Sequence, residues 1–144
     1  MEKRIDWLKP DCKVTDHFEV RDCLWLGKWG RLANGGDGLT FEIKSSLIET
    51  CILAEKIREI LDCPMIVTSI YRPQSYAHLV GSGPLSAHCF GLAMDFIPEL
   101  EIDAAKALIR PHLVAFDCRM EKGTPNWIHI DRRKPGPSGR EFNP

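Results

Sequence analysis

The chain has 144 residues, of which 44% are hydrophobic and 27% are charged. This length and composition fit one globular domain with a packed core and argue against global disorder. Nineteen basic and twenty acidic residues give a net charge of -1, so no overall positive field would gather nucleic acid or anionic lipid.

The N-terminal residues, Met1 to Asp6, are mostly charged and lack the apolar run of a secretory signal. No stretch of the chain approaches the roughly 18 apolar residues that a membrane helix requires. We therefore expect synthesis in the cytoplasm and no membrane insertion, so another protein must release the chain if it acts outside the cell. The six cysteines form no Cys-x-x-Cys pair, which favours free thiols in a reducing compartment.

Residues 1–40 show little periodicity and are rich in turn formers. We interpret them as an arm that wraps the rest of the domain, and four of its apolar residues are candidates for anchoring it: Trp25, Leu26, Trp29 and Leu32. The glycine-rich stretch 34–38 is a loop and not a phosphate-binding loop, because no Gly-Lys-Ser/Thr follows it.

The expected main domain, residues 41–131, opens with a helix. Apolar residues recur at steps of three and four from Ile43 to Leu61, which predicts one buried helix face. Pro64 ends this helix, because a proline disfavours helical geometry in the residue before it. The β-branched run 65–71 then predicts a buried strand.

Further elements alternate along the second half of the chain. Residues 72–87 predict a loop that could contain one helical turn, and 91–96 a second strand. A short helix is expected from Asp103 to about Leu113. Two strands, at 114–120 and 127–131, follow with a turn between them, and 132–144 is expected to be a mobile tail. The sum is an α+β fold with helices packed on a small, largely antiparallel sheet.

The second and last of these strands each carry a polar residue away from their apolar face. Strand side chains alternate between faces, so Met94 and Phe96 would face the core and Asp95 would face away, with room beside it at Ala93. The last strand repeats the pattern, because Ile128 and Ile130 would face the core while three neighbours would face away: Trp127, His129 and Asp131.

His88 precedes Gly91 by three residues, in a bend that could bring it back over the sheet. His88, Asp95 and His129 would then form a three-ligand set for Zn²⁺ with a fourth position open for water. Such a site lowers the pKa of a coordinated water to about 7 and polarises a carbonyl oxygen, as amide hydrolysis requires. Taken singly, each of these side chains is more often a hydrogen-bonded structural residue, so the spacing alone leaves both interpretations open.

The segment from Ser86 to Asp95 has the form Ser-x-His-x-x-Gly-x-Ala-x-Asp, and Trp-Ile-His ending at His129 follows it. This motif pair resembles the zinc D-Ala-D-Ala carboxypeptidase family, which includes phage endolysins that cut the L-alanyl-D-glutamate bond. That family shares its fold with the zinc domain of hedgehog signalling proteins. Residues 66–72 resemble the family's strand ending in Tyr-Arg, and Gly81-Ser82 resembles its usual loop, so the likeness covers roughly residues 40–131.

The resemblance implies zinc as cofactor, held by His88, Asp95 and His129. It further implies that Arg72 binds substrate or stabilises the oxyanion, a role suited to a permanent cation, and that Ser86 shapes the site through hydrogen bonds. Tyr71 and Trp127 are expected to be packing residues.

One position departs from the family pattern. Many members carry an acidic general base three residues before the last histidine ligand, where this chain has Asn126, and an amide cannot take up and return a proton. Glu121 or Asp131 could replace it, another loop could supply the base, or the protein could bind zinc without cutting. For Asp131 we favour orientation of a ligand.

We therefore expect a zinc metallopeptidase that acts on peptidoglycan stem or cross-link peptides, as a D-Ala-D-Ala carboxypeptidase or an endolysin. The alternative is a zinc-binding module of the same fold with weak or no catalysis. We expect a monomer with a peptidoglycan peptide as partner and no nucleic acid, released to the cell wall through a holin-type pore if it serves phage lysis.

Overall fold

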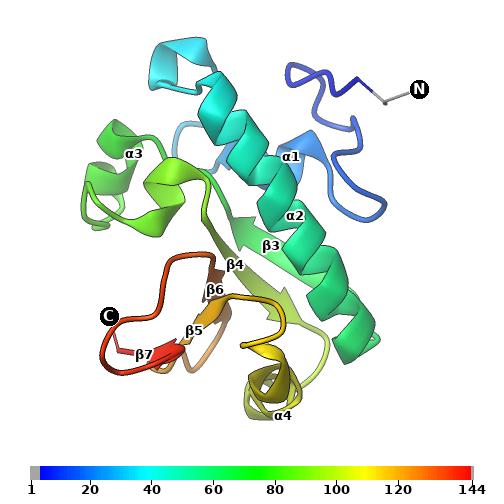
Figure 1. The fold of residues 1–144 in the computed structure, drawn as a ribbon. Coiled ribbons are helices and arrows are strands. Elements are labelled where there is room, and N and C mark those ends of the chain that lie inside the picture. The colour runs from blue at the N-terminus through cyan, green and yellow to red at the C-terminus, as the bar shows by residue number, and fades with distance from the viewer. Residues whose placement is uncertain (1–3, 144) are drawn as a thin grey trace.

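The main sheet has five strands in the order β3-β4-β6-β5-β7, and we describe it from a computed structural model that covers residues 4–143 (Figure 1). Neighbouring strands are antiparallel except β5 and β7, which are parallel. The expected α+β fold with a small, largely antiparallel sheet is confirmed. The strands are β3 (Met65–Ser69), β4 (Ala93–Pro98), β5 (Arg119–Glu121), β6 (Ile128–Asp131) and β7 (Glu141–Phe142).

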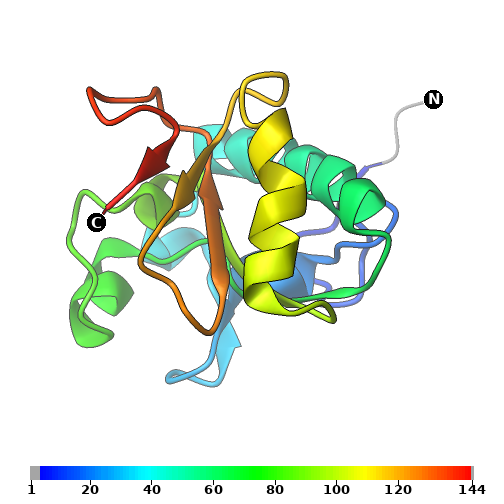
Figure 2. The same cartoon turned by 90° about the horizontal axis from the view of Figure 1, so that it is seen from below.

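Helices α2 (Phe41–Leu61) and α4 (Ile102–Ile109) cover the same face of this sheet (Figure 2). Thr40 begins α2, where its Oγ1 accepts a hydrogen bond from the backbone N–H of Ile43 at 3.2 Å. The chain leaves α2 at Asp62 in the left-handed conformation, two residues before Pro64. Buried apolar side chains from helix and sheet meet in one core, among them Leu47, Cys51, Ala54, Ile57, Met94, Phe96, Ile128 and Ile130.

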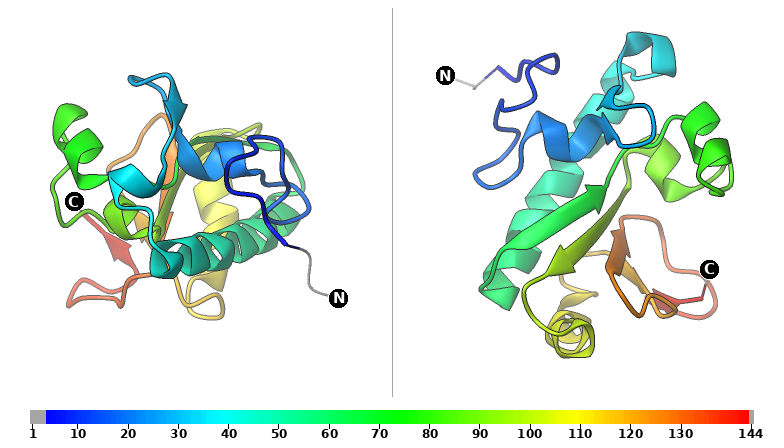
Figure 3. Two further views of the ribbon diagram at one scale, coloured as in Figure 1. Left: turned by 90° about the horizontal axis from the view of Figure 1, so that it is seen from above. Right: turned by 180° about the vertical axis from the view of Figure 1, so that it is seen from behind.

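The N-terminal arm packs beside β3 and α2 (Figure 3). It contains α1 (Val20–Leu24), the two-stranded ribbon of β1 (Trp25–Leu26) and β2 (Arg31–Leu32), and a short 3-10 helix (Gly35–Asp37). Of the four expected anchors, Leu26 is buried and Trp29 and Leu32 pack against the core, but Trp25 is 40% exposed. Three buried residues that the sequence analysis did not single out also anchor the arm: Phe18, Val20 and Leu24.

Two strand predictions were wrong in part. β3 is not buried, because it is the last strand of the sheet and alternate side chains face away from the core, so Ile66 is 65% exposed. The strand expected from Val114 begins only at Arg119. A 3-10 turn (Arg110–His112) prolongs α4, and Asp117 turns the backbone in the left-handed region before the strand can start.

The C-terminal segment differs from the expected mobile tail, because two parts of it are fastened to the domain. β7 pairs with β5, and the Arg132 guanidinium donates to Thr50 Oγ1 at 3.1 Å and to the Ser46 carbonyl at 2.9 Å, both on α2. A two-residue strand is too short to produce a periodic signal in a sequence. Residues 1–3 and 144, which the expected arm and tail include, lie outside the described range.

Among residues 4–143 the helices are too short or too polar to cross a bilayer. The division of the chain at residues 40 and 131 stays a prediction.

A buried lysine supports the turn that leads into β6. Lys106 of α4 is 7% exposed, and its ammonium group donates to the carbonyl oxygens of Thr124 at 2.9 Å and Lys122 at 3.4 Å. Replacing Lys106 with methionine keeps the apolar stem and leaves both carbonyls without this donor. We expect the free energy of unfolding in urea to fall by about 1–3 kcal/mol. The exposed Lys28→Met should change it by less than about 0.5 kcal/mol, and an equal loss in both variants would contradict the role of Lys106.

Candidate metal centre and its cavity

The sheet register brings Asp95 of β4 directly opposite His129 of β6. Their flanking neighbours, Met94 and Phe96 on β4 and Ile130 on β6, are buried in the core. Because side chains alternate along a strand, Asp95 and His129 project from the sheet face opposite α2 and α4. The predicted alternation of side chains along the strands is confirmed. The antiparallel pairing of β4 with β6 also brings Asp95 and His129 next to each other.

His88 reaches the same point from a short 3-10 helix, Ala87–Phe90. Ser86 begins this turn, and its Oγ accepts a hydrogen bond from the His88 backbone N–H at 3.3 Å. Gly91 ends the turn at φ 72°, where a Cβ atom would lie 3.1 Å from the carbonyl oxygen of Ile43, so glycine is required for the return to β4. The role in the site that the resemblance implies for Ser86 stays a prediction.

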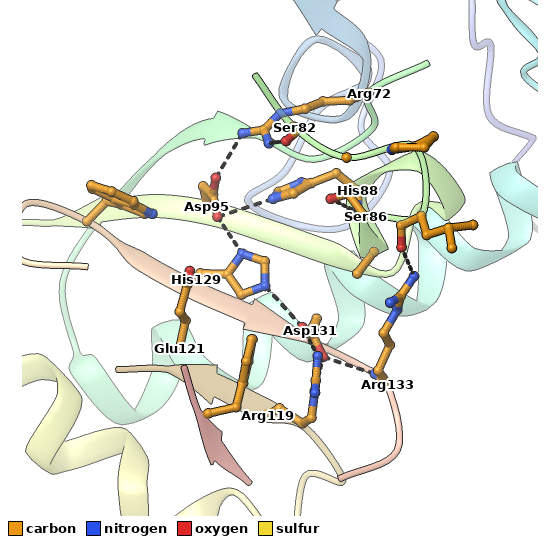
Figure 4. Close-up of a pocket in the computed structure, with 16 residues that line it drawn as sticks. Arg72, Ser82, Ser86, His88, Asp95, Arg119, Glu121, His129, Asp131 and Arg133 are labelled. Atoms are coloured by element: carbon orange, nitrogen blue, oxygen red, sulfur yellow. Dashed lines mark hydrogen bonds and ion pairs between the residues drawn. The ribbon is translucent and has the colours of Figure 1, made fainter. Parts of the chain in front are cut away.

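The three side chains fit a metal ion (Figure 4). One ligand atom from each lies within 4.8 Å of the others. His88 Nδ1 lies 2.8 Å from the carbonyl oxygen of Ile70, which only accepts, so Nδ1 carries the proton and Nε2 has a free lone pair. That Nε2 is buried without a hydrogen bond among the described residues, 3.3 Å from Asp95 Oδ1.

Burial lowers the pKa of His88 and favours its neutral form. Its Nε2 lone pair and the Asp95 carboxylate then face each other as two acceptors with no proton between them. A cation bound between the two atoms would satisfy both, which is the strongest indication of a metal in the geometry.

Arg72 holds the other oxygen of the Asp95 carboxylate. Its Nη2 donates to Asp95 Oδ2 at 3.0 Å, and the remaining nitrogens donate to the hydroxyls of Ser69 and Ser82, each at 2.9 Å. Burial alone would raise the pKa of Asp95, but the hydrogen bond from His129 holds it well below its usual range. These contacts are those of a residue that positions Asp95, and the oxyanion role of Arg72 stays a prediction.

His129 lies between two carboxylates. Its Nδ1 is 2.8 Å from Asp95 Oδ1, and its Nε2 is 3.0 Å from Asp131 Oδ2. Burial alone would lower the pKa of His129, but the hydrogen bonds to Asp131 and Asp95 raise it to about 9. The ring is therefore protonated on both nitrogens at neutral pH, and a metal at Nδ1 must displace a proton.

Asp131 is almost fully buried, and its oxygens are occupied by protein donors. Arg119 donates to both of them, at 2.8 and 2.9 Å, and the backbone N–H of Arg133 donates to Oδ1 at 3.1 Å. Burial raises the pKa of Asp131, but hydrogen bonds from His129 and Arg119 outweigh it and lower the pKa to about 2. A carboxylate bonded in this way is suited to orienting His129, since it has no free edge toward a reacting water.

Zinc binding is expected to release about one proton per ion at pH 6, because His129 must lose the proton that its pKa of about 9 retains. Burial lowers the pKa of His88, so His88 contributes less than His129, and Asp95 contributes none because its pKa lies well below its usual range. Titration calorimetry in two buffers of different ionisation enthalpy measures the number of protons released per zinc ion bound. A value near zero would mean that zinc does not bind through His129.

The three side chains open into a cavity of about 630 Å³. Its walls come from the loop 82–88, from β4, β5 and β6, and from the C-terminal segment. Asn126 is exposed and is not among the residues that line the cavity. Glu121 lines it, and continuing the β5–β6 register by one residue places Glu121 opposite His129 (Figure 4). Within residues 4–143 its carboxylate makes no hydrogen bond or ion pair.

Several residues that build this cavity were not predicted from the sequence. Arg119 and Phe142 lie together, with the guanidinium carbon 3.9 Å from the ring centre. Arg133 lines the wall beside the loop 82–88. Trp127, expected to be a packing residue, also lines the cavity. Only strand pairing places Arg119 beside Asp131, and no spacing along the chain would have revealed it.

The cavity and the ligand cluster lie in the part of the chain that matches a known family. Residues 28–131 match the family model described as Peptidase M15, and this range is more than half of the chain. It includes His88, Asp95 and His129. No curated protein and no solved structure was found to match the chain.

Proposed function

Because the chain belongs to the M15 family of peptidases and is thus a zinc metallopeptidase acting on peptidoglycan peptides, we propose that it is an endopeptidase. Its substrate would be the stem peptide, cut between L-alanine and D-glutamate. We further propose that His88 Nε2, Asp95 Oδ1 and His129 Nδ1 hold the zinc. The unpartnered Nε2 facing a carboxylate oxygen supports this ligand set.

The contacts of Arg72 support the choice of an endopeptidase. A carboxypeptidase must bind the terminal carboxylate of its substrate next to the scissile bond, which calls for an uncommitted cation beside the metal ligands. Arg72 is the cation that contacts Asp95, and protein acceptors already occupy its nitrogens. The cavity volume of about 630 Å³ lies in the range of about 300–1,000 Å³ that encloses drug-sized ligands. It therefore has room for a chain that continues past the scissile bond.

Each residue has a defined part in the reaction. Bound zinc supplies a Lewis acid for the scissile carbonyl and lowers the pKa of a coordinated water to about 7. Glu121 accepts the proton of the attacking water and passes it to the leaving amine, as a general base and then a general acid. Arg72 and Asp131 keep Asp95 and His129 in place through the hydrogen bonds described above.

One substrate tests this proposal. An N-acetylated stem pentapeptide, L-Ala-γ-D-Glu-L-Lys-D-Ala-D-Ala, contains both the bond of the endopeptidase and that of the carboxypeptidase. Zinc-loaded protein is expected to release N-acetylalanine, detected by mass spectrometry, and chelation of the zinc should stop the release. Free D-alanine alone would show a carboxypeptidase. Absence of cleavage with zinc retained would support the non-catalytic module that Asn126 suggested.

A further inference from the structure

The last strand, β7, brings one aromatic side chain to the metal centre. Its register with β5 places Phe142 beside Glu121, and paired residues of neighbouring strands point to the same side of a sheet. The backbone N–H of Lys122 donates to the Phe142 carbonyl oxygen at 2.8 Å. The carboxylate of Glu141 accepts a hydrogen bond from Arg110 Nε at 2.8 Å. Phe142 is therefore held on the face of the sheet that carries the cavity, and it forms part of the cavity wall.

The ring of Phe142 lies against polar groups and not against the apolar core. Its centre is 3.9 Å from the guanidinium carbon of Arg119. It is 5.8 Å from the centre of the His129 ring, with an angle of 76° between the two ring planes. Among the described residues, those that form the core or pack against it do not include Phe142. Burial in the core therefore does not explain the position of this ring, whereas contact with Arg119 does.

Arg119 connects Phe142 to a metal ligand. One of its two hydrogen bonds to Asp131 ends on Oδ2 at 2.9 Å, and the same oxygen lies 3.0 Å from His129 Nε2 (Figure 4). An aromatic face attracts a guanidinium and limits its rotation, which keeps both donors directed at the carboxylate. The Arg119 side chain is only 15% exposed, so water competes little with the ring. The orientation of Asp131, and through it that of His129, thus depends on the C-terminal strand.

We propose that Phe142 is a positioning residue of the metal centre, which acts through Arg119 and Asp131 to keep His129 in the orientation that binds zinc. The inference rests on the proposed ligand set, in which His129 Nδ1 holds the metal. Phe142 lies beyond residues 28–131, so the family match does not include it. The C-terminal segment of this chain thus completes a metal centre whose ligands all lie within the matched range.

Zinc affinity tests this role without the need for turnover, measured on metal-free protein by competition with a chromogenic chelator. Phe142→Leu keeps an apolar side chain in β7 and removes the aromatic face. It is expected to weaken zinc binding about 3- to 10-fold, less than the loss of about 10- to 100-fold when a ligand's own hydrogen-bond partner is removed, because Phe142 acts through two other side chains. Phe142→Tyr keeps the ring and should retain wild-type affinity.

The same substitution at Phe41 is the control, because Phe41 is 78% exposed at the start of α2 and does not line the cavity. Phe41→Leu should leave the zinc affinity unchanged. A double variant tests the route through Arg119. In Arg119→Gln the cation is absent, so adding Phe142→Leu should change the affinity by less than about 2-fold.

Three results would overturn the inference: wild-type affinity in Phe142→Leu, equal weakening in Phe142→Tyr, or an undiminished effect of Phe142→Leu in the Arg119→Gln background. The single variants decide the role of the ring even if Arg119→Gln fails to fold. Each of these results would leave the proposed function intact, because the wild-type protein would still bind zinc. Cleavage of the stem pentapeptide at another bond would refute the proposed function, while the zinc affinities would still judge Phe142.

Discussion

Replacing His88 with alanine is expected to abolish stoichiometric zinc binding and peptide hydrolysis together. The substitution removes a buried ring nitrogen that has no hydrogen-bond partner among residues 4–143, and with it a proposed ligand of the metal. Loss of a residue that only supports a ligand lowers metal affinity by about 10–100-fold, so loss of the ligand itself should exceed that range. Elemental analysis of the purified protein gives the zinc content, and the stem pentapeptide gives the activity.

The matched control is His78→Ala, because His78 is exposed on α3 (Gln74–Leu79), outside the cavity. It should retain one zinc per chain and full activity. His88→Ala also loses the hydrogen bond to Ile70, so a thermal unfolding curve must show that the variant is folded. Asp95→Asn offers a second variant of nearly unchanged shape, in which the charge that attracts the cation is removed. Wild-type zinc content in folded His88→Ala would exclude the proposed ligand set.

Strand alternation was sufficient to predict which side chains leave the core. Asp95 and His129 could be assigned to the solvent side of their strands because apolar residues at every second position fixed the opposite face. Their direct pairing could not be predicted, since register depends on how two strands separated by some thirty residues slide against each other. Only the resemblance to the family motif indicated that Asp95 and His129 lie together.

The errors have local causes that composition does not reveal. Val114, Ala115 and Phe116 have a strand-like composition, but the segment continues from α4 as tight turns, and Val114 is 76% exposed. Asp117 then adopts a positive φ that few residues other than glycine and asparagine favour. Tertiary contacts also determine the structure of the C-terminal segment, because β7 forms through its pairing with β5.

The general base illustrates the limit of a motif. The family pattern directs attention to position 126, but the structure leaves Asn126 exposed beside the hairpin turn and brings Glu121 to the cavity from the neighbouring strand. A role that one strand supplies in some proteins can be supplied by its neighbour in others, because residues opposite each other in a sheet point to the same side. Spacing along a single strand cannot detect such an exchange.

Replacing Glu121 with glutamine is therefore expected to lower kcat on the stem pentapeptide by about 10²- to 10⁴-fold, the usual contribution of a positioned acid-base group. Zinc content should stay at one per chain, because Glu121 is not a proposed ligand and an amide of the same size preserves the packing. This separation of activity from metal content distinguishes a base from a ligand. Measured together, kcat and zinc content decide between the two roles.

Asn126→Asp is the companion variant, since it restores a carboxylate at the position where the resembling family carries its base. Because residue 126 is exposed and does not line the cavity, the new carboxylate should not rescue Glu121→Gln in the double variant, and the single variant should behave as wild type. Rescue would mean that the loop before β6 closes over the metal when substrate binds and that the base belongs to the loop. Loss of activity in Glu121→Gln without rescue would instead assign proton transfer to β5, on the side of His129 away from Asp95.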